Sequence, residues 1–190
     1  MFPTFVMTAL LAVAAAFAVP ARAQPAVLQG VALQDHRQQP LHKAGLQGQA
    51  TLLHLVFTTC SSTCPTQVLD LAQVHGALPA DVRRRLRVLS LTVDPLSDTP
   101  QALAAYARRL DADRPGWHFV TGAPQQVHRV LDRLQALDTR QGPAQAADHR
   151  TQLYLYDADG NLRLRLAGVP VDRRRLADEL TQLARLGPQP

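Results

Sequence analysis

The sequence predicts an α/β fold in which a mixed β-sheet carries helices on both faces. Short apolar runs typical of buried strands alternate along the chain with stretches whose apolar residues recur at helical spacing. Near the C-terminus, two such runs flank Asp159-Gly160, a dipeptide that favours a tight antiparallel hairpin. Apolar residues make up 46% of the 190 residues, which is enough for the core of one domain of ordinary size.

The expected strands follow the apolar and β-branched runs. Thr51 to Phe57 is apolar except for His54, which indicates a strand buried on both faces. Arg87 to Val93 shows the same character and predicts a second central strand. In chain order, we expect a short hairpin over 26–33 that turns at Gln29-Gly30, strands over 51–57, 87–93 and 117–120, and a hairpin formed by 152–156 and 162–166.

The expected helices begin at prolines or capping residues. Pro65 suits the first turn of a helix, and Asp98 and Thr99 followed by Pro100 supply an N-cap and a first helical residue. We expect helices over 65–75, 100–110, 124–137 and 171–186. Strand–helix units that end in a hairpin and a helix are typical of thioredoxin-like domains.

The first 23 residues have the features of a signal peptide. Phe5 to Val19 is apolar, Pro20 interrupts the run, and Ala21-Arg22-Ala23 provides the small-x-small cleavage pattern. We therefore expect a signal peptide over 1–23, a mature domain over 24–190, and export to the periplasm, an oxidising compartment. If the segment is not cleaved, it would anchor the protein to the membrane.

The remaining composition excludes several classes of protein. The net charge of +5 comes without any nucleic-acid recognition motif, so we expect no nucleic-acid partner. The basic residues predict a solvated surface, with docking on an anionic partner or a membrane surface as the alternative. Two cysteines are too few for a disulfide scaffold or a four-thiolate zinc site.

Cys60 and Cys64 carry the most informative chemistry, because they stand where a strand ends and a helix begins. Free N–H groups and the helix dipole at such a position favour thiolate over thiol. The spacing of four residues brings both sulfurs to one side of the first turn, where they can bond each other or share an ion. A stabilising disulfide around so short a loop would contribute only about 2 kcal/mol. A redox-active or metal-binding pair is therefore the preferred interpretation.

A histidine stands where a thioredoxin-type redox site would have a proline, just before the strand expected to face the cysteines. Asp148-His149-Arg150-Thr151 leads into that strand. Two thiolates and one imidazole make a soft ligand set suited to copper, whereas zinc needs a fourth ligand. Spacing alone does not single out His149 among seven histidines. His54 and His75 are expected to pack inside, and the others to lie on the surface or in loops.

The chain resembles the Sco/SenC copper proteins, which are associated with cytochrome c oxidase assembly. The resemblance covers about Leu33 to Ala167 and implies a thioredoxin-like fold with copper bound by Cys60, Cys64 and His149. It rests on FTTCSSTCP at 57–65, SLTVDPLSDTP at 90–100, PGWHFVTG at 115–122 and DHRTQLYLYDADGNL at 148–162.

The resemblance implies a copper chaperone rather than an enzyme. One copper per chain, Cu(I) or Cu(II), would pass by ligand exchange to a client such as an oxidase subunit. The alternative is a thiol–disulfide oxidoreductase that uses Cys60 and Cys64 on an exported client, with a thiol reductant as a further partner. Asp94 and Asp98 follow the second strand at the same end of the sheet. Asp94 and Asp98 have two possible roles, a supporting role near the ligands and an ordinary role as turn or cap residues. The turn and cap roles are expected.

Overall fold

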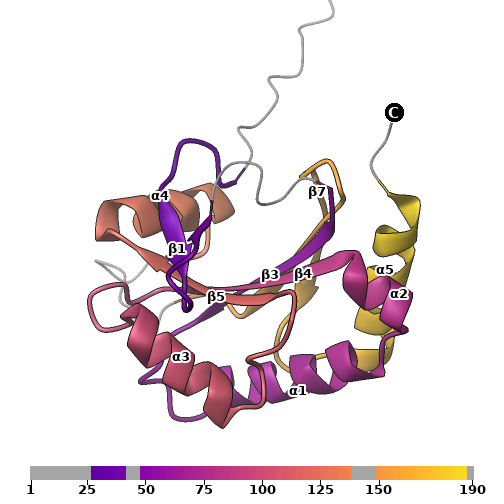
Figure 1. Ribbon diagram of the computed structural model, residues 1–190, viewed down its shortest axis with the longest axis horizontal. Coiled ribbons are helices and arrows are strands. Elements are labelled where there is room, and N and C mark those ends of the chain that lie inside the picture. Colours follow the sequence, from indigo (N-terminus) through magenta and orange to yellow (C-terminus); the bar gives the residue numbers. More distant parts are fainter. Residues whose placement is uncertain (1–26, 42–47, 138–148, 188–190) are drawn as a thin grey trace, which may run out of the picture.

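A computed structural model describes residues 27–41, 48–137 and 149–187, and the described residues contain one seven-stranded sheet flanked by helices (Figure 1). The strands are β1 (Leu33–Asp35), β2 (Pro40–Leu41), β3 (Ala50–Val56), β4 (Leu86–Thr92), β5 (Trp117–Gly122), β6 (Gln152–Tyr156) and β7 (Leu162–Ala167). The helices are α1 (Thr63–Ala77), α2 (Ala80–Arg84), α3 (Pro100–Arg109), α4 (Pro124–Leu134) and α5 (Arg173–Leu186).

The sheet is mixed, as predicted. Its strand order is β2-β1-β5-β4-β3-β6-β7. The three central strands β3, β4 and β5 run parallel, because helical crossovers connect them. The strands outside them pair in antiparallel fashion: β1 with β5 and β2, β6 with β3, and β7 with β6.

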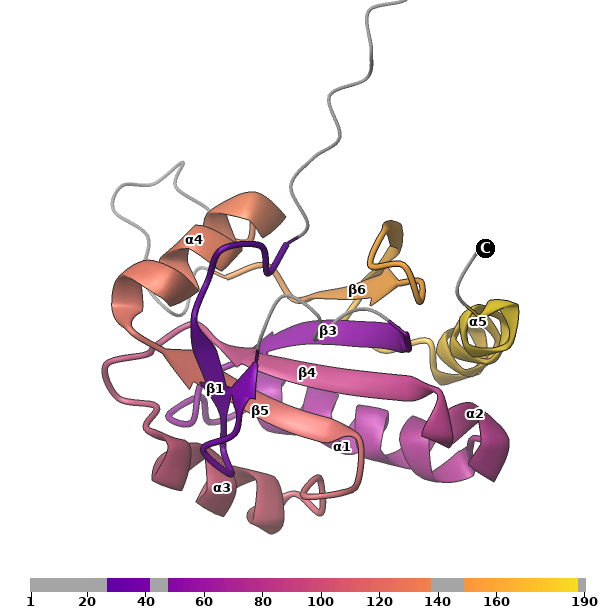
Figure 2. The ribbon, with the colours of Figure 1, turned by 45° about the horizontal axis from the view of Figure 1, so that its top comes forward.

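Successive residues of the central strands point into two separate hydrophobic cores, as the alternation of side chains along a strand requires. In β3, Leu52 and Val56 belong to one core, whereas Leu53 and Leu55 belong to the other. Residues of α1, α2, α3 and α5 complete the first core, and α4 covers the opposite face (Figure 2). The predicted placement of helices on both faces is confirmed.

Local predictions differ from the structure at several points. The helix expected over 124–137 ends at Leu134, because Gln135 adopts a left-handed conformation and Leu137 pairs with His149 in an antiparallel bridge. The expected hairpin at 26–33 is wrong: residues 27–30 form a turn, and the first strand, Leu33–Asp35, pairs with β2 and β5 instead. Val27, Leu28 and Val31 are apolar because they pack into the core on the α4 side. The short helix α2 was not predicted, and it is fixed by Val82, which is 1% exposed.

The topology brings two loops together at one edge of the sheet. Because β3 and β4 are parallel, their carboxyl ends meet, with Val56 paired to Thr92. The cysteine segment follows β3 and leads into α1, and the loop containing Asp98 follows β4 and leads into α3. Within the described ranges, no helix is both long and apolar enough to cross a membrane, and the expected signal peptide over 1–23 lies outside those ranges.

Candidate metal centre

The two cysteines lie against each other at the N-terminal end of α1. The backbone N–H of Cys64 donates to the Cys60 sulfur at 3.3 Å. Both residues are free thiols; Cys64 is buried and Cys60 is half-buried. The predicted juxtaposition of two thiols at the start of a helix is therefore present, and one of them remains accessible to an incoming partner.

The surroundings shift the pKa values of these two thiols in opposite directions. Burial alone would raise the pKa of Cys60, but hydrogen bonds from the Cys64 thiol and from the backbone N–H groups of Cys64, Ser62 and Thr63 outweigh it, so its pKa falls below the ordinary value. For Cys64, burial and the hydrogen bond to Cys60 raise the pKa to about 12. Cys60 is thus the more acidic cysteine of the pair, and the Cys64 thiol donates a hydrogen bond to it.

Asp98 fastens the segment that carries the cysteines to the neighbouring loop. Its carboxylate is fully buried and accepts from the Thr58 backbone N–H at 3.1 Å and from the Thr58 hydroxyl at 2.5 Å. The Thr92 hydroxyl at the end of β4 donates to its second oxygen at 2.5 Å. Thr99, rather than Asp98, caps α3. The supporting role considered for Asp98 therefore fits its contacts, whereas the expected cap role does not.

Asp94 has the simpler role of a turn residue. It is half-buried, and its carboxylate receives a long hydrogen bond of 3.4 Å from the Ser97 backbone N–H. Its own backbone N–H donates to the Thr92 hydroxyl at 2.9 Å. The turn interpretation of Asp94 is thus confirmed.

His149 lies at the same edge as the cysteines, although the structure does not place it in a complete ligand set. Its ring packs edge-on against Phe57, three residues before Cys60, with 5.6 Å between ring centroids. Among the described residues, no three His, Cys, Asp or Glu side chains lie close enough together to hold a metal ion. The two sulfurs form a pair suited to Cu(I), and a Cys60–Cys64–His149 site requires the imidazole to close on them.

His54 belongs to the core, as predicted, and links α1 to the sheet. Its Nδ1 donates to the Gln67 side-chain oxygen at 3.0 Å, and its Nε2 accepts from the Ser90 hydroxyl at 2.7 Å. Trp117 in turn donates to Ser90 at 2.9 Å, and the Gln67 amide donates to the carbonyl of Gly168 at 3.0 Å. Burial lowers the pKa of His54 to about 4. This neutral, fully bonded imidazole positions the first turns of α1 and is not a candidate ligand.

Two histidines outside the site pair with carboxylates. His36 was expected near the surface but is buried, because its Nε2 meets Asp113 at 3.1 Å and its Nδ1 accepts from the backbone of Phe119. His118 meets the buried Asp35 at 2.8 Å. These pairs join β1 to β5 and its preceding loop, and they explain both histidines without a metal.

Tyr106 is a buried polar residue that the sequence analysis did not single out. It comes from α3, its ring is buried, and its hydroxyl has no hydrogen-bond partner within the described residues. Burial raises its pKa, and the charges of Cys64 and Cys60 raise it further. Helical spacing indicates that Tyr106 faces the core, but only the packing of α3 against the sheet shows which residues it meets.

The sequence and the fold of this chain have counterparts in known proteins. The profile of the family described as SCO1/SenC matches residues 20–185. The mitochondrial SCO2 homolog of Bos taurus is 33% identical over 169 residues, which cover 85% of this chain and 60% of the bovine protein. The chain spans 55% to 64% of the length of three curated relatives that it matches.

Solved structures show the same architecture. ScoI of Bradyrhizobium japonicum, determined with copper bound, has a TM-score of 0.67 and 23% identity, and the match covers 80% of this chain and 96% of ScoI. BsSco, described with a disulfide switch and as a member of the Sco family of cytochrome c oxidase assembly proteins, has a TM-score of 0.67 and 22% identity, covering 82% of this chain and 91% of BsSco. The predicted thioredoxin-like fold is thereby confirmed.

Proposed function

The chain belongs to the SCO1/SenC family, and from this premise we propose that it is a copper chaperone that delivers copper to a respiratory oxidase copper centre. The single observation that carries the proposal is the pair of free, adjacent thiols at the start of α1 with pKa values shifted in opposite directions. ScoI holds copper, and BsSco is an oxidase assembly protein, which supports the same role for this chain. The protein acts after export, released if residues 1–23 are cleaved and membrane-anchored if they remain.

The unequal acidity of the thiols sets the order in which the protein takes up its cargo. Cys60 has the lowered pKa and is half-exposed, so it meets an incoming Cu(I) ion first. Cys64 follows when its proton leaves for solvent, because a bound metal ion favours the deprotonated ligand. His149 then supplies the third ligand as its imidazole closes on the sulfurs.

Release proceeds by ligand exchange. A three-coordinate Cu(I) ion has room for a ligand of the client, and each exchange forms one bond to the client and breaks one to Cys60, Cys64 or His149. Asp98 assists by holding Thr58, so the cysteine segment keeps its position while the ligands change. No electron is transferred in this cycle, and the copper keeps its oxidation state.

Copper uptake by reduced and oxidised protein tests this proposal. The reduced chain should bind about one Cu(I) per molecule, whereas protein with a Cys60–Cys64 disulfide should bind none, because both sulfurs are then used. Thiol counting before and after copper addition follows the sulfurs directly. Equal uptake by both forms would show that the dithiolate is not the site.

Replacement of His149 tests the third ligand. His149→Ala should weaken Cu(I) binding without abolishing it, because Cu(I) accepts two sulfur ligands, and should abolish or strongly alter Cu(II) binding, which needs nitrogen. His128→Ala, at an exposed position on α4, is the matched control and should change neither. An unchanged Cu(II) spectrum in His149→Ala would remove His149 from the ligand set.

The same thiols favour one second candidate, thiol–disulfide exchange on an exported client. A half-exposed cysteine of lowered pKa beside a buried thiol of high pKa is the arrangement of an attacking and a resolving cysteine. In that reaction Cys60 attacks the client disulfide, one client sulfur leaves as thiol, and Cys64 then displaces the other to leave a Cys60–Cys64 disulfide. Multiple turnovers with a disulfide substrate and a thiol reductant would favour this function over copper delivery.

A further inference from the structure

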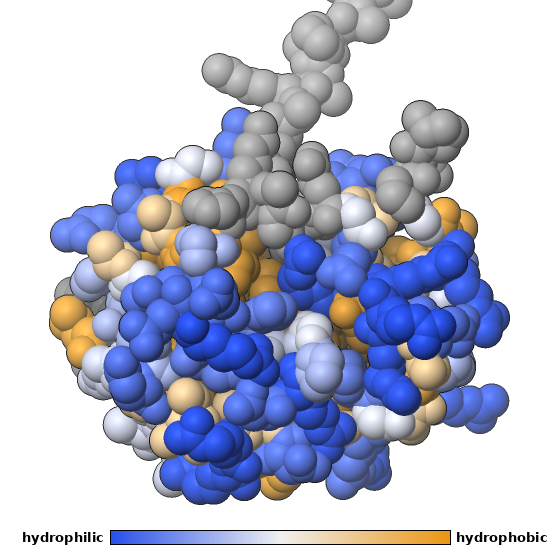
Figure 3. Space-filling model, viewed as in Figure 1, coloured by the Kyte–Doolittle hydropathy of each residue, from blue (hydrophilic) through white to orange (hydrophobic). Residues whose placement is uncertain are grey.

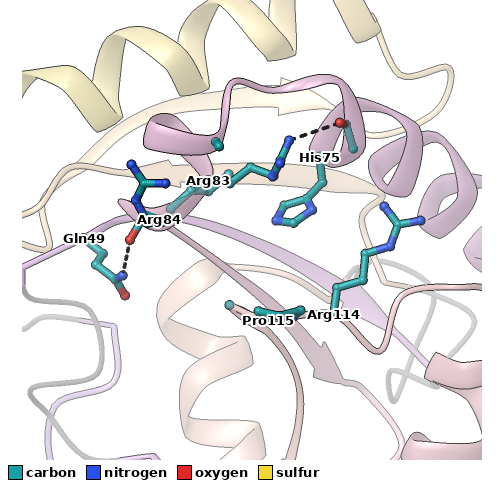
Figure 4. A pocket seen from close by; sticks show the side chains of 10 residues that line it. Gln49, His75, Arg83, Arg84, Arg114 and Pro115 are labelled. Atoms are coloured by element: carbon teal, nitrogen blue, oxygen red, sulfur yellow. Dashed lines mark hydrogen bonds between the residues drawn. The ribbon is translucent and has the colours of Figure 1, made fainter.

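A hollow lies at the opposite end of α1 from the cysteines. It has a volume of about 700 Å³ and is lined by the C-terminal end of α1, by α2, and by the loop that precedes β5 (Figure 4). Cys64 lies in the first turn of α1 and His75 in its last turn, about 16 Å apart along the helix at 1.5 Å per residue. The hollow, called here the arginine pocket, is therefore separate from the candidate copper site.

The arginine pocket concentrates positive charge. Arg83 and Arg84 from α2 and Arg114 from the loop before β5 line it, together with Gln49, and no carboxylate is among the described residues that line it. Arg114 is paired with Asp111, whose side chain is 86% exposed. Hydrophilic residues gather on the surface over α2 (Figure 3). Asp111 offsets one of the three positive charges, and the guanidinium groups of Arg83 and Arg84 still repel each other unless a further anion is present.

Two of the arginines are held in place by the protein itself. Arg83 donates through Nη1 to the carbonyls of Gly76 and Leu78, and Arg114 donates through Nη1 to the carbonyl of Ala72. These bonds cap the C-terminal end of α1, and each uses one of the two terminal nitrogens of its guanidinium. The second terminal nitrogen of Arg114, Nη2, donates to Asp111. A guanidinium has five N–H donors in a planar fork, so Nη2 and Nε of Arg83 and the remaining N–H groups of Arg114 are left for a ligand.

His75 supplies an independent indication of a ligand. Its side chain is 6% exposed, and neither ring nitrogen has a hydrogen-bond partner among the described residues. Figure 4 shows its imidazole between Arg83 and Arg114, on the wall of the pocket. Burial and the charges of Arg114 and Arg83 lower its pKa to about 4, so the ring is neutral near pH 7 and offers one N–H donor. Buried polar groups without partners are rare in folded proteins, and a bound oxyanion would accept this donor.

We propose that the arginine pocket binds the phosphate group of a small organic phosphate or of a phospholipid headgroup. Guanidinium forks match the oxygens of phosphate, and the three arginines with His75 and Gln49 provide donors from several directions. The pocket is larger than a bare phosphate needs, and Leu86 and Pro115 give it apolar walls for an organic group. This site does not depend on copper, so its test uses the reduced, metal-free protein.

Calorimetric titration with inorganic phosphate and with phenyl phosphate, at constant ionic strength, tests the proposal. Arg84 is exposed and its side chain makes no bond within the described residues, so Arg84→Gln should leave the fold intact and weaken binding about tenfold. Arg108→Gln removes the same charge from α3, away from the pocket, and should leave the affinity unchanged. His75→Phe, which keeps an aromatic ring near Trp117, should also weaken binding.

Two further readouts complete the test. In the NMR titration of His75, phosphate should raise the pKa of the imidazole, because a bound anion offsets the charges of Arg83 and Arg114. Flotation with phosphatidylcholine vesicles that contain phosphatidic acid separates the sources: binding to these vesicles but not to phenyl phosphate identifies a headgroup site, and the reverse identifies a soluble phosphate. Absence of binding to all probes, or equal losses in Arg84→Gln and Arg108→Gln, would overturn the proposal.

Discussion

Removal of the Asp98 carboxylate should loosen the cysteine segment and destabilise the whole domain. In Asp98→Ala, three donors, the Thr58 N–H, the Thr58 hydroxyl and the Thr92 hydroxyl, lose a buried charged acceptor. A hydrogen bond to a charged group contributes about 1.5–3 kcal/mol, and such contributions are not additive within one cluster. We expect the free energy of unfolding to fall by about 3–5 kcal/mol, a large share of the ~5–15 kcal/mol of a typical domain.

Asp98→Asn removes the charge of the side chain while keeping its volume. The amide keeps the shape of the side chain and one acceptor oxygen, so the free energy of unfolding should fall by only about 1–2 kcal/mol. The lost negative charge also acts on the copper site, because Asp98 helps to raise the pKa of Cys64. In Asp98→Asn the pKa of Cys64 should therefore fall below about 12.

Urea denaturation measures the free energy of unfolding, with the fluorescence of Trp117, the single tryptophan, as the signal. The ultraviolet absorbance of the thiolates, recorded against pH, measures the pKa of Cys64. Asp94→Asn is the matched control, since it makes the same substitution in the same loop at a half-buried turn position. It should change the free energy of unfolding by less than about 0.5 kcal/mol. If Asp98→Ala proves no less stable than Asp94→Asn, Asp98 does not hold the cysteine segment in place.

Three other predictions concern acid sensitivity, thiol reactivity and processing. His54 and His75 have folded pKa values of about 4 against 6.5 in the unfolded chain, so the unfolded state binds protons first as the pH falls. The free energy of unfolding should be highest above pH 6.5 and should decrease toward pH 4 by about 3 kcal/mol for each histidine. Denaturation at several pH values should show this decrease, and the decrease should be smaller in His75→Phe. Iodoacetamide at neutral pH should label Cys60 before Cys64 by peptide mass spectrometry, and preferential labelling of Cys64 would contradict the assigned acidities. The exported protein should begin at Gln24 by N-terminal analysis, and recovery only in membranes with residues 1–23 present would favour the anchor.

The central strands and the main helices could be predicted from sequence because their patterns are local. Apolar runs marked β3 and β4, and prolines at helix starts marked α3 and α4. The expected hairpin at 26–33 failed because those apolar residues pack against α4 instead of pairing with each other. Apolar residues indicate that a segment is buried. Whether the buried segment forms a strand depends on a neighbouring strand that is distant in sequence.

In the candidate site, too, the features that depend on neighbouring residues could be predicted, whereas those that depend on contacts distant in sequence could not. The cysteine spacing predicted the thiol pair, since both residues belong to one turn of chain. The contact of Asp98 with Thr58 depends on the pairing of β3 with β4, and the position of Tyr106 depends on how α3 packs. The arginine pocket gathers residues from three separate segments, so no single run of sequence indicates it.

X-ray absorption at the copper edge directly tests whether Cys60, Cys64 and His149 bind copper. The sample is the reduced chain loaded with one equivalent of Cu(I), compared with His149→Ala prepared in the same way. We expect two sulfur ligands and one nitrogen ligand in the first protein, and two sulfur ligands without that nitrogen in the variant. A spectrum with fewer than two sulfurs, or with a nitrogen ligand that persists in His149→Ala, would contradict copper binding by Cys60, Cys64 and His149.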